Sequence, residues 1–247
     1  MSGKTIRLDR LLANLGYGSR REILLLARAG RIRLDGEILR DAEQKIALDP
    51  SLAARLSVDG EELDPLPGVV LMMNKPVGVT CSRKESGPLV FSLLPERWRR
   101  RDPAISTVGR LDKDTSGLLL LTDNGALLHR IISPRSSTPK TYRATLDRPL
   151  RGDEAKIFAS GVLMLEGEDK PLLPARMDVW DERTALLTLR EGRYHQVRRM
   201  FAAVGNHVTA LHRISIGALA LPGDLAPGEF ALLDAEGIAR IFRVEPS

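Results

Sequence analysis

Residues 108–125 read VGRLDKDTSGLLLLTDNG and join a charged stretch to a run of leucines. An uninterrupted apolar run of this length is typical of a buried strand. Arg110 and Asp112 come before the run, so a guanidinium and a carboxylate are expected at the mouth of that strand. A rigid strand would hold both groups in a fixed geometry, as a binding or catalytic site requires.

The same stretch holds a second carboxylate, Asp114. If the segment is a strand, Asp112 and Asp114 project from the same face. Paired carboxylates could bind magnesium or perform acid–base chemistry, which would allow a magnesium-dependent nuclease. The neighbouring cations Arg110 and Lys113 would neutralise part of this charge, so the nuclease is the weaker alternative.

The bulk composition indicates a globular protein with an anionic partner. The chain has 247 residues, of which 43% are hydrophobic, enough for a sizeable core. Its net charge is +5 and its pI is about 9.6. A single cysteine, Cys81, fits a reducing compartment. We find no signal peptide and no apolar run of membrane-spanning length, and expect a soluble, cytoplasmic, monomeric protein.

A first domain is expected over residues 1–63. Ser19 is a plausible N-cap for a helix over 20–29, and Asp-Gly pairs at 35–36 and 59–60 are signals for tight hairpin turns. The pattern predicts two short helices followed by small strands. Apolar residues recur at helical spacing in the first of these helices, namely Ile6, Leu8, Leu11, Leu12 and Leu15.

Basic residues are concentrated in the second helix and the strand after it. Between Ser19 and Arg33 there is only one acidic residue, Glu22, against five arginines: Arg20, Arg21, Arg28, Arg31 and Arg33. For an isolated helix a solvated face would be the simpler interpretation. Because the excess continues into the strand, the unit resembles the S4 RNA-binding domain, and the resemblance implies RNA contacts for Arg20, Arg21, Arg28 and Arg31.

Residues 64–68, rich in proline, are expected to be a linker to a second domain over 69–247. In this part strands outnumber helices and do not alternate regularly with them. We therefore expect an α+β fold with a mixed, mostly antiparallel sheet flanked by helices. Residues 140–146 are expected to form a strand, 152–161 a helix, and 184–205 a strand, a turn and a helix.

The sequence shows no motif for binding a nucleotide cofactor or a zinc ion. It lacks a phosphate-binding P-loop, and its four histidines are not spaced as zinc ligands. We expect neither a metal nor a cofactor.

Several separated stretches resemble the RsuA-type pseudouridine synthases of ribosomal RNA. They are LMMNKPVGVTCS at 71–82, the opening stretch at 108–125, KTYRATL at 140–146 and EGRYHQVRRMFAAVGNHV at 191–208. These enzymes turn a uracil from an N-linked into a C-linked base, which needs a nucleophile or anion at the sugar. The resemblance implies that Asp112 supplies it and that Tyr142 stacks under the uracil or removes a proton. Arg198 is expected to pair with Asp112.

The same resemblance implies a set of RNA contacts in this domain: Arg110, which would fill the space left by the flipped base, with Lys75, Arg193 and Arg199. The stretch at 191–208 and DLAPGEF at 224–230 look most like the members that modify small-subunit rRNA. We therefore expect ribosomal RNA, or a partly assembled small ribosomal subunit, as the partner. A large-subunit rRNA enzyme and a non-catalytic ribosome-assembly factor of the same fold remain as alternatives.

Overall fold

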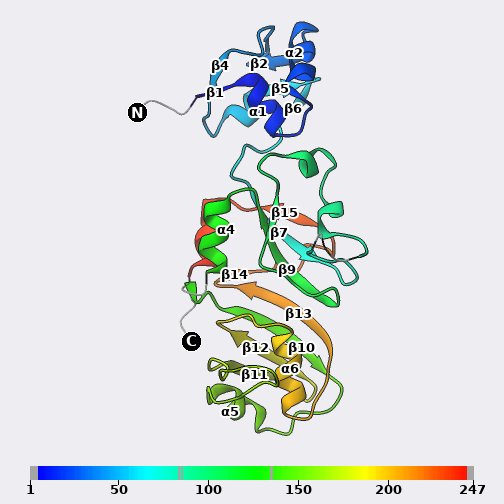
Figure 1. Ribbon diagram of the computed structural model, residues 1–247, viewed down its shortest axis with the longest axis vertical. Coiled ribbons are helices and arrows are strands. Elements are labelled where there is room, and N and C mark those ends of the chain that lie inside the picture. Colours follow the sequence, from blue (N-terminus) through cyan, green and yellow to red (C-terminus); the bar gives the residue numbers. More distant parts are fainter. Residues whose placement is uncertain (1–4, 83, 85, 134–135, 244–247) are drawn as a thin grey trace. The chain divides into compact units, whose positions relative to one another are not determined.

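The computed structural model describes residues 5–82, 84, 86–133 and 136–243, which form two compact units (Figure 1). Unit 1 contains the described residues up to Val69 together with Leu94–Ser106 and Thr122–Asn124. Unit 2 contains the rest of the described chain. Two short segments that follow the first strand of unit 2 in the sequence therefore pack with the N-terminal part.

Unit 1 is built from short elements. They are β1 (Thr5–Arg7), α1 (Leu8–Asn14), α2 (Arg20–Arg28), β2 (Ile32–Leu34), β3 (Glu37–Ile38), β4 (Lys45–Ala47), α3 (Leu52–Arg55), β5 (Leu56–Val58), β6 (Glu61–Glu62) and the 3₁₀ turn η2 (Arg97–Arg100). One sheet has the order β3-β2-β5-β6, and β1 pairs with β4. Their common core includes leucines of α1, Ile23 of α2 and Ile32 of β2.

The predicted helix cap and hairpin turn of unit 1 are confirmed. The Ser19 side chain accepts a hydrogen bond from the Glu22 amide, and the Glu22 carboxylate accepts one from the Ser19 amide, which forms a capping box at the start of α2. Asp35 and Gly36 have φ angles of 53° and 82°, as the tight hairpin between β2 and β3 requires.

The inserted segment Leu94–Ser106 is held to unit 1 by buried charges. Arg101 and Asp123 form an ion pair of 3.0 Å, with side chains only 1% and 2% exposed. Arg101 also donates to the Pro65 carbonyl at 2.9 Å, and Asp123 accepts from the Gly68 amide at 2.8 Å. Residues 65 and 68 of the expected linker are thus tied into the unit.

Unit 2 contains a mixed sheet, as the sequence predicts. Its elements are β7 (Val70–Lys75), η1 (Val90–Leu93), β8 (Ser106–Val108), β9 (Thr115–Thr122), α4 (Gly125–Ile132), β10 (Lys140–Leu146), α5 (Glu154–Ala159), β11 (Arg176–Asp181), β12 (Thr184–Leu189), α6 (Gln196–Ala203), β13 (Val208–Ile216), β14 (Leu219–Ala220), β15 (Phe230–Leu232) and α7 (Ala235–Ile241). The main strand order is β11-β12-β10-β13-β9-β7-β15. β13 runs parallel to β9 and antiparallel to β10.

Two helix pairs cover different parts of this sheet. Helices α5 and α6 contribute Phe158, Met200 and Phe201 to a core with β10, β12 and β13. Helix α4 and the C-terminal helix α7 contribute Ile131 and Ile241 to a core with β7, β9 and β13. No helix among the described residues is long and apolar enough to cross a membrane.

Candidate active site

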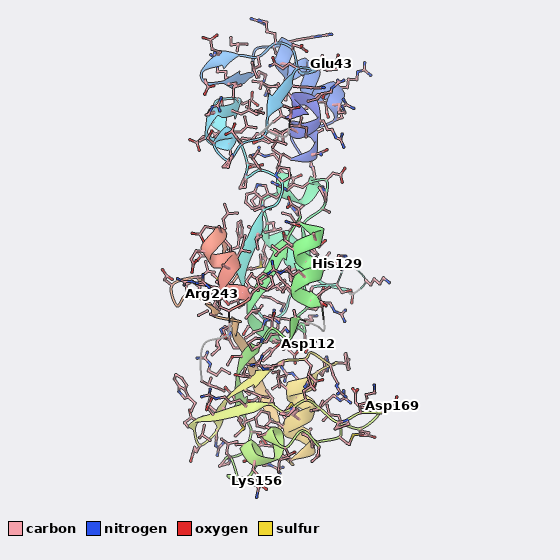
Figure 2. All side chains as sticks on the ribbon, turned by 90° about the vertical axis from the view of Figure 1, so that its left-hand side faces the viewer. Glu43, Asp112, His129, Lys156, Asp169 and Arg243 are labelled. Carbon is pink, nitrogen blue, oxygen red and sulfur yellow. The ribbon has the colours of Figure 1, made fainter. Side chains whose placement is uncertain are left out.

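The segment between β8 and β9, residues 109–114, is a loop and not the strand that was considered for it. It leads into β9, whose leucines 118–121 are all fully buried, as predicted. Asp112 lies on this loop, between the part of unit 2 covered by α4 and the part covered by α6 (Figure 2). A hollow of about 260 Å³ is lined by Asp112, Tyr142 and the turn 191–197.

The Lys75 side chain holds the Asp112 loop through hydrogen bonds to backbone carbonyls. Its side chain is 0% exposed, and its ammonium donates to the carbonyl oxygens of Thr115 at 2.9 Å, Pro76 at 3.0 Å and Asp112 at 3.1 Å. Burial lowers the pKa of Lys75. The structure therefore corrects the expected RNA contact, because the ammonium is enclosed and already bound to the backbone.

Replacing Lys75 by Met is expected to destabilise the protein by about 1–3 kcal/mol, because buried carbonyl oxygens would lose their donor. The loop would then lose its anchor, so turnover should fall together with stability. Urea unfolding of the variant measures the first effect. An unfolding curve identical to that of the unsubstituted protein would show that the carbonyls do not depend on the ammonium.

Tyr142 comes from the middle of β10 and is half-buried at the hollow. Arg213, on the neighbouring strand β13, is its register partner and is 3% exposed. The Arg213 guanidinium donates from Nε to the Leu118 carbonyl at 2.7 Å and reaches the Tyr142 hydroxyl with Nη1 at 3.5 Å. Gly117 permits the close approach of the Arg213 backbone to β9, because a Cβ at Gly117 would lie 2.3 Å from the Arg213 carbonyl oxygen. The buried Arg213 guanidinium therefore lies next to the Tyr142 hydroxyl.

The three arginines of the stretch 191–208 have partners other than Asp112. Arg198 forms an ion pair of 2.8 Å with Asp114 and donates to the Val208 carbonyl at 2.8 Å. Arg193 and Arg199 bind the two oxygens of the Glu168 carboxylate, at 3.1 Å and 2.8 Å. The expected pairing of Arg198 with Asp112 is therefore corrected, because Arg198 pairs with Asp114 instead.

A histidine occupies the position expected for an arginine. The His195 Nε2 lies 3.5 Å from Asp112 Oδ1, a distance at which a protonated imidazole forms an ion pair with the carboxylate. His195 directly precedes α6 and has a φ of 49° in the left-handed region, rare for a residue other than glycine. Its ring stacks on Tyr194 with centroids 3.9 Å apart. The two carboxylates of the loop therefore have different neighbours, Arg198 for Asp114 and His195 for Asp112.

The remaining predicted RNA contacts are on the surface. Arg110 is exposed at the hollow. In unit 1, Arg21 and Arg28 are exposed, whereas Arg20 pairs with the buried Asp9 at 2.9 Å and Arg31 pairs with Asp59. Paired arginines keep their charge but carry less net positive potential than the other two.

Comparison with known proteins decides the family. The model of the RNA pseudouridylate synthase family matches residues 69–203, and that of the S4 domain matches residues 6–49. The chain belongs to the RNA pseudouridylate synthase family. The isomerase assignment and the N-terminal S4 domain, both expected from the sequence motifs, are confirmed.

Relatives of this synthase match over nearly the whole chain. The ribosomal small subunit pseudouridine synthase A of Yersinia pestis is 42% identical, over 96% of this chain and 98% of its own length. The protein of the same name from Escherichia coli (strain K12) is also 42% identical, over 96% of this chain and 100% of its own length. A crystal structure titled pseudouridylate synthase superposes with a TM-score of 0.67 at 34% identity, covering 96% of this chain and 99% of the other.

Sequence reasoning missed two residues that lie beside Asp112 and Tyr142 in the candidate site. No role beside Asp112 was expected for His195, and nothing in the pattern reveals its left-handed backbone. Arg213 did have a signal. It stands two positions after the buried Leu211 in a strand, so it faces the core with that leucine, where an arginine needs a buried partner.

Proposed function

We propose that this protein isomerises a uridine to pseudouridine in small-subunit ribosomal RNA, with Asp112 as the nucleophile. The observation that carries the proposal is the common hollow that Asp112 and Tyr142 line, from a loop and a strand of unit 2. Support for the small-subunit substrate comes from the names of the two relatives at 42% identity. A cytoplasmic location and a monomeric state are part of the same proposal.

The proposed reaction keeps every atom of the base. The Asp112 carboxylate bonds to C1′ of the ribose as the N1–C1′ bond breaks, and the uracil turns over in the hollow. C5 then attacks C1′ and releases the carboxylate, after which C5 loses its proton and N1 gains one. No electrons enter or leave, so the chemistry calls for a nucleophile, an acceptor for the C5 proton and a donor of the N1 proton.

Tyr142 is positioned to hold the extruded base. Enzymes that act on a base take it out of its stack and place it against an aromatic or apolar surface. The Tyr142 ring lines the hollow together with Leu189 and Leu211, which provides such a surface. Its oxygen, beside the Arg213 guanidinium, accepts the proton from C5 as the hydroxyl gives up its own proton.

A magnesium nuclease is disfavoured by the ion pairs of the loop. Two carboxylates that share a metal must both offer free oxygens to it. Asp114 is bound to Arg198 at 2.8 Å, and Asp112 lies next to His195. Activity in excess EDTA separates the two reactions, because the nuclease would stop whereas the isomerisation would continue.

Release of tritium from uridine labelled at C5 tests the proposal directly, since C5 loses its hydrogen when the new bond forms. The protein should release tritium from a small-subunit rRNA transcript or from partly assembled small-subunit particles, and not from large-subunit rRNA. Release only from large-subunit rRNA would move the substrate to that subunit. Binding without release from either RNA would favour the assembly factor.

The S4 domain is expected to act as an RNA clamp through its exposed arginines. Replacing both Arg21 and Arg28 by Ser should weaken binding and lower the slope of log affinity against log salt by about one per lost phosphate contact. Turnover at saturating RNA should change little, because phosphate contacts position the RNA. Salt-dependent binding measurements check this, and an unchanged slope would make α2 an ordinary solvated helix.

A further inference from the structure

The turn that carries His195 is fixed by an unusually dense polar network. The Glu191 carboxylate accepts hydrogen bonds from the side-chain Nε2 of Gln196 at 2.9 Å and from Arg193 Nε at 3.1 Å. The Gln196 side chain, 4% exposed, in turn accepts from the Arg193 amide at 2.8 Å. These hydrogen bonds join Glu191 and Arg193, before His195, to Gln196, which follows it.

A second loop, residues 166–171, locks the same turn from outside. Glu168 bridges Arg193 and Arg199, which lowers the pKa of its carboxyl. Arg193 also donates to the Lys170 carbonyl at 2.7 Å, and Arg199 donates to the Glu166 carbonyl at 2.6 Å. The guanidiniums expected to contact RNA are therefore used to join two loops of the protein.

We propose that His195 orients the Asp112 carboxylate and that the Glu168–Arg193–Arg199 network holds His195 in place for this purpose. The proposal rests on the proposed function of Asp112 as nucleophile. Its evidence is the 3.5 Å separation of Nε2 and Oδ1, the left-handed backbone of His195 and the stacking of its ring on Tyr194. A residue in a sparsely populated conformation persists only where its surroundings enforce it, and the network provides that enforcement.

His195 and Glu168 are thus positioning residues, and they should affect the rate more than the affinity. A carboxylate that attacks C1′ must be aligned with the breaking bond, and a displacement of about 1 Å can cost about a hundredfold in rate. Phosphate contacts behave in the opposite way, since they change affinity and its salt dependence.

The test uses substitutions matched to the imidazole geometry. His195→Asn tolerates a left-handed backbone but is too short to place an N–H where Nε2 lies. His195→Gln keeps an N–H donor close to the Nε2 position. We expect His195→Asn to lower the single-turnover rate of tritium release about a hundredfold. His195→Gln should recover most of that loss, and both variants should bind the transcript as tightly as the unsubstituted protein.

Glu168→Gln tests the network, with Asp169→Asn as its control. Asp169 lies beside Glu168 in the sequence, is exposed and projects from the outer edge of the loop (Figure 2). Glu168→Gln should lower the single-turnover rate about tenfold, because the turn is loosened and not removed. Asp169→Asn should leave the rate unchanged.

Two results would overturn the inference while the proposed function stands. One is a His195→Asn variant that turns over as fast as the unsubstituted protein. The other is a Glu168→Gln variant with an unchanged rate, tighter RNA binding and a steeper salt slope, which would show that Arg193 and Arg199 are phosphate contacts masked by Glu168. If the unsubstituted protein itself releases no tritium from any of the RNAs, the proposed function fails and the inference fails with it.

Discussion

Replacing Asp112 by Asn is expected to abolish pseudouridine formation, with a loss in rate of at least about a thousandfold, as the removal of a nucleophile causes in other enzymes. Asn keeps the size and shape of the side chain but has neither its charge nor its nucleophilicity. The remaining hollow, with Tyr142 and Arg110, can still receive the base without forming a bond to C1′.

RNA affinity should survive this substitution. The Asp112 side chain is 37% exposed, so removing its negative charge cannot weaken contacts with a polyanion. The control is Asp153→Asn, in a carboxylate of similar size that is 57% exposed and pairs with Arg151 outside the hollow. Single-turnover tritium release and a binding isotherm measure the two effects. Turnover of the Asp112→Asn variant above about a hundredth of the normal rate would contradict the nucleophile assignment.

Replacing Asp123 by Ala is expected to destabilise unit 1 by about 3–5 kcal/mol, the usual effect of leaving one member of a buried ion pair alone. Of the side-chain hydrogen bonds that Arg101 makes to described residues, the one to the Pro65 carbonyl would then remain. Its Nε and Nη1 are buried and have no hydrogen-bond partner among the described residues, so the charge has no substitute for Asp123. The Gly68 amide would lose its acceptor as well.

The same segment offers a matched control. Glu96 pairs with Arg100 one helical turn away, but both side chains are about two-thirds exposed. Glu96→Ala should therefore cost no more than about 1 kcal/mol. The free energies of unfolding in urea compare the two variants. Similar costs for both would show that the Arg101–Asp123 pair does not hold the segment. Replacing both partners, by Met and Leu, should recover part of the stability lost in Asp123→Ala.

This pair also changes how the S4 domain should be tested. Deleting residues 1–66 would be the simplest way to remove that domain. Such a deletion would take away the Pro65 carbonyl from Arg101, and Asp64 and Tyr17 from Arg97. A loss of activity in the truncated chain could then come from unfolding of 94–106 and not from lost RNA contacts. Substitutions of Arg21 and Arg28 avoid this ambiguity.

Local sequence signals predicted the secondary structure well where one residue determines the backbone. The capping residue Ser19 and the Asp-Gly turns lie where expected, and β10 spans the predicted residues 140–146. Ile6 was assigned to a helix because its spacing fits one, yet it lies in β1, where pairing with β4 determines its conformation. Such pairing comes from residues about 40 positions away and leaves no local mark.

Some residues of the candidate site were predictable from the sequence, but their contacts were not. The motifs identified Asp112 and Tyr142, which line one hollow. They could not show which cation serves which carboxylate, because that depends on where loops 109–114 and 166–171 lie in space. Lys75 illustrates the point. A lysine before a proline looks like a surface cation in the sequence, and only the fold encloses it beneath the loop it stabilises.

The most direct measurement of the central claim is a pseudouridine map of ribosomal RNA from cells with and without this gene. The account predicts that one pseudouridine of the small-subunit rRNA disappears when the gene is deleted. The intact gene should restore it, whereas a gene encoding Asp112→Asn should not. Identical maps with and without the gene, or restoration by the Asp112→Asn protein, would contradict the account.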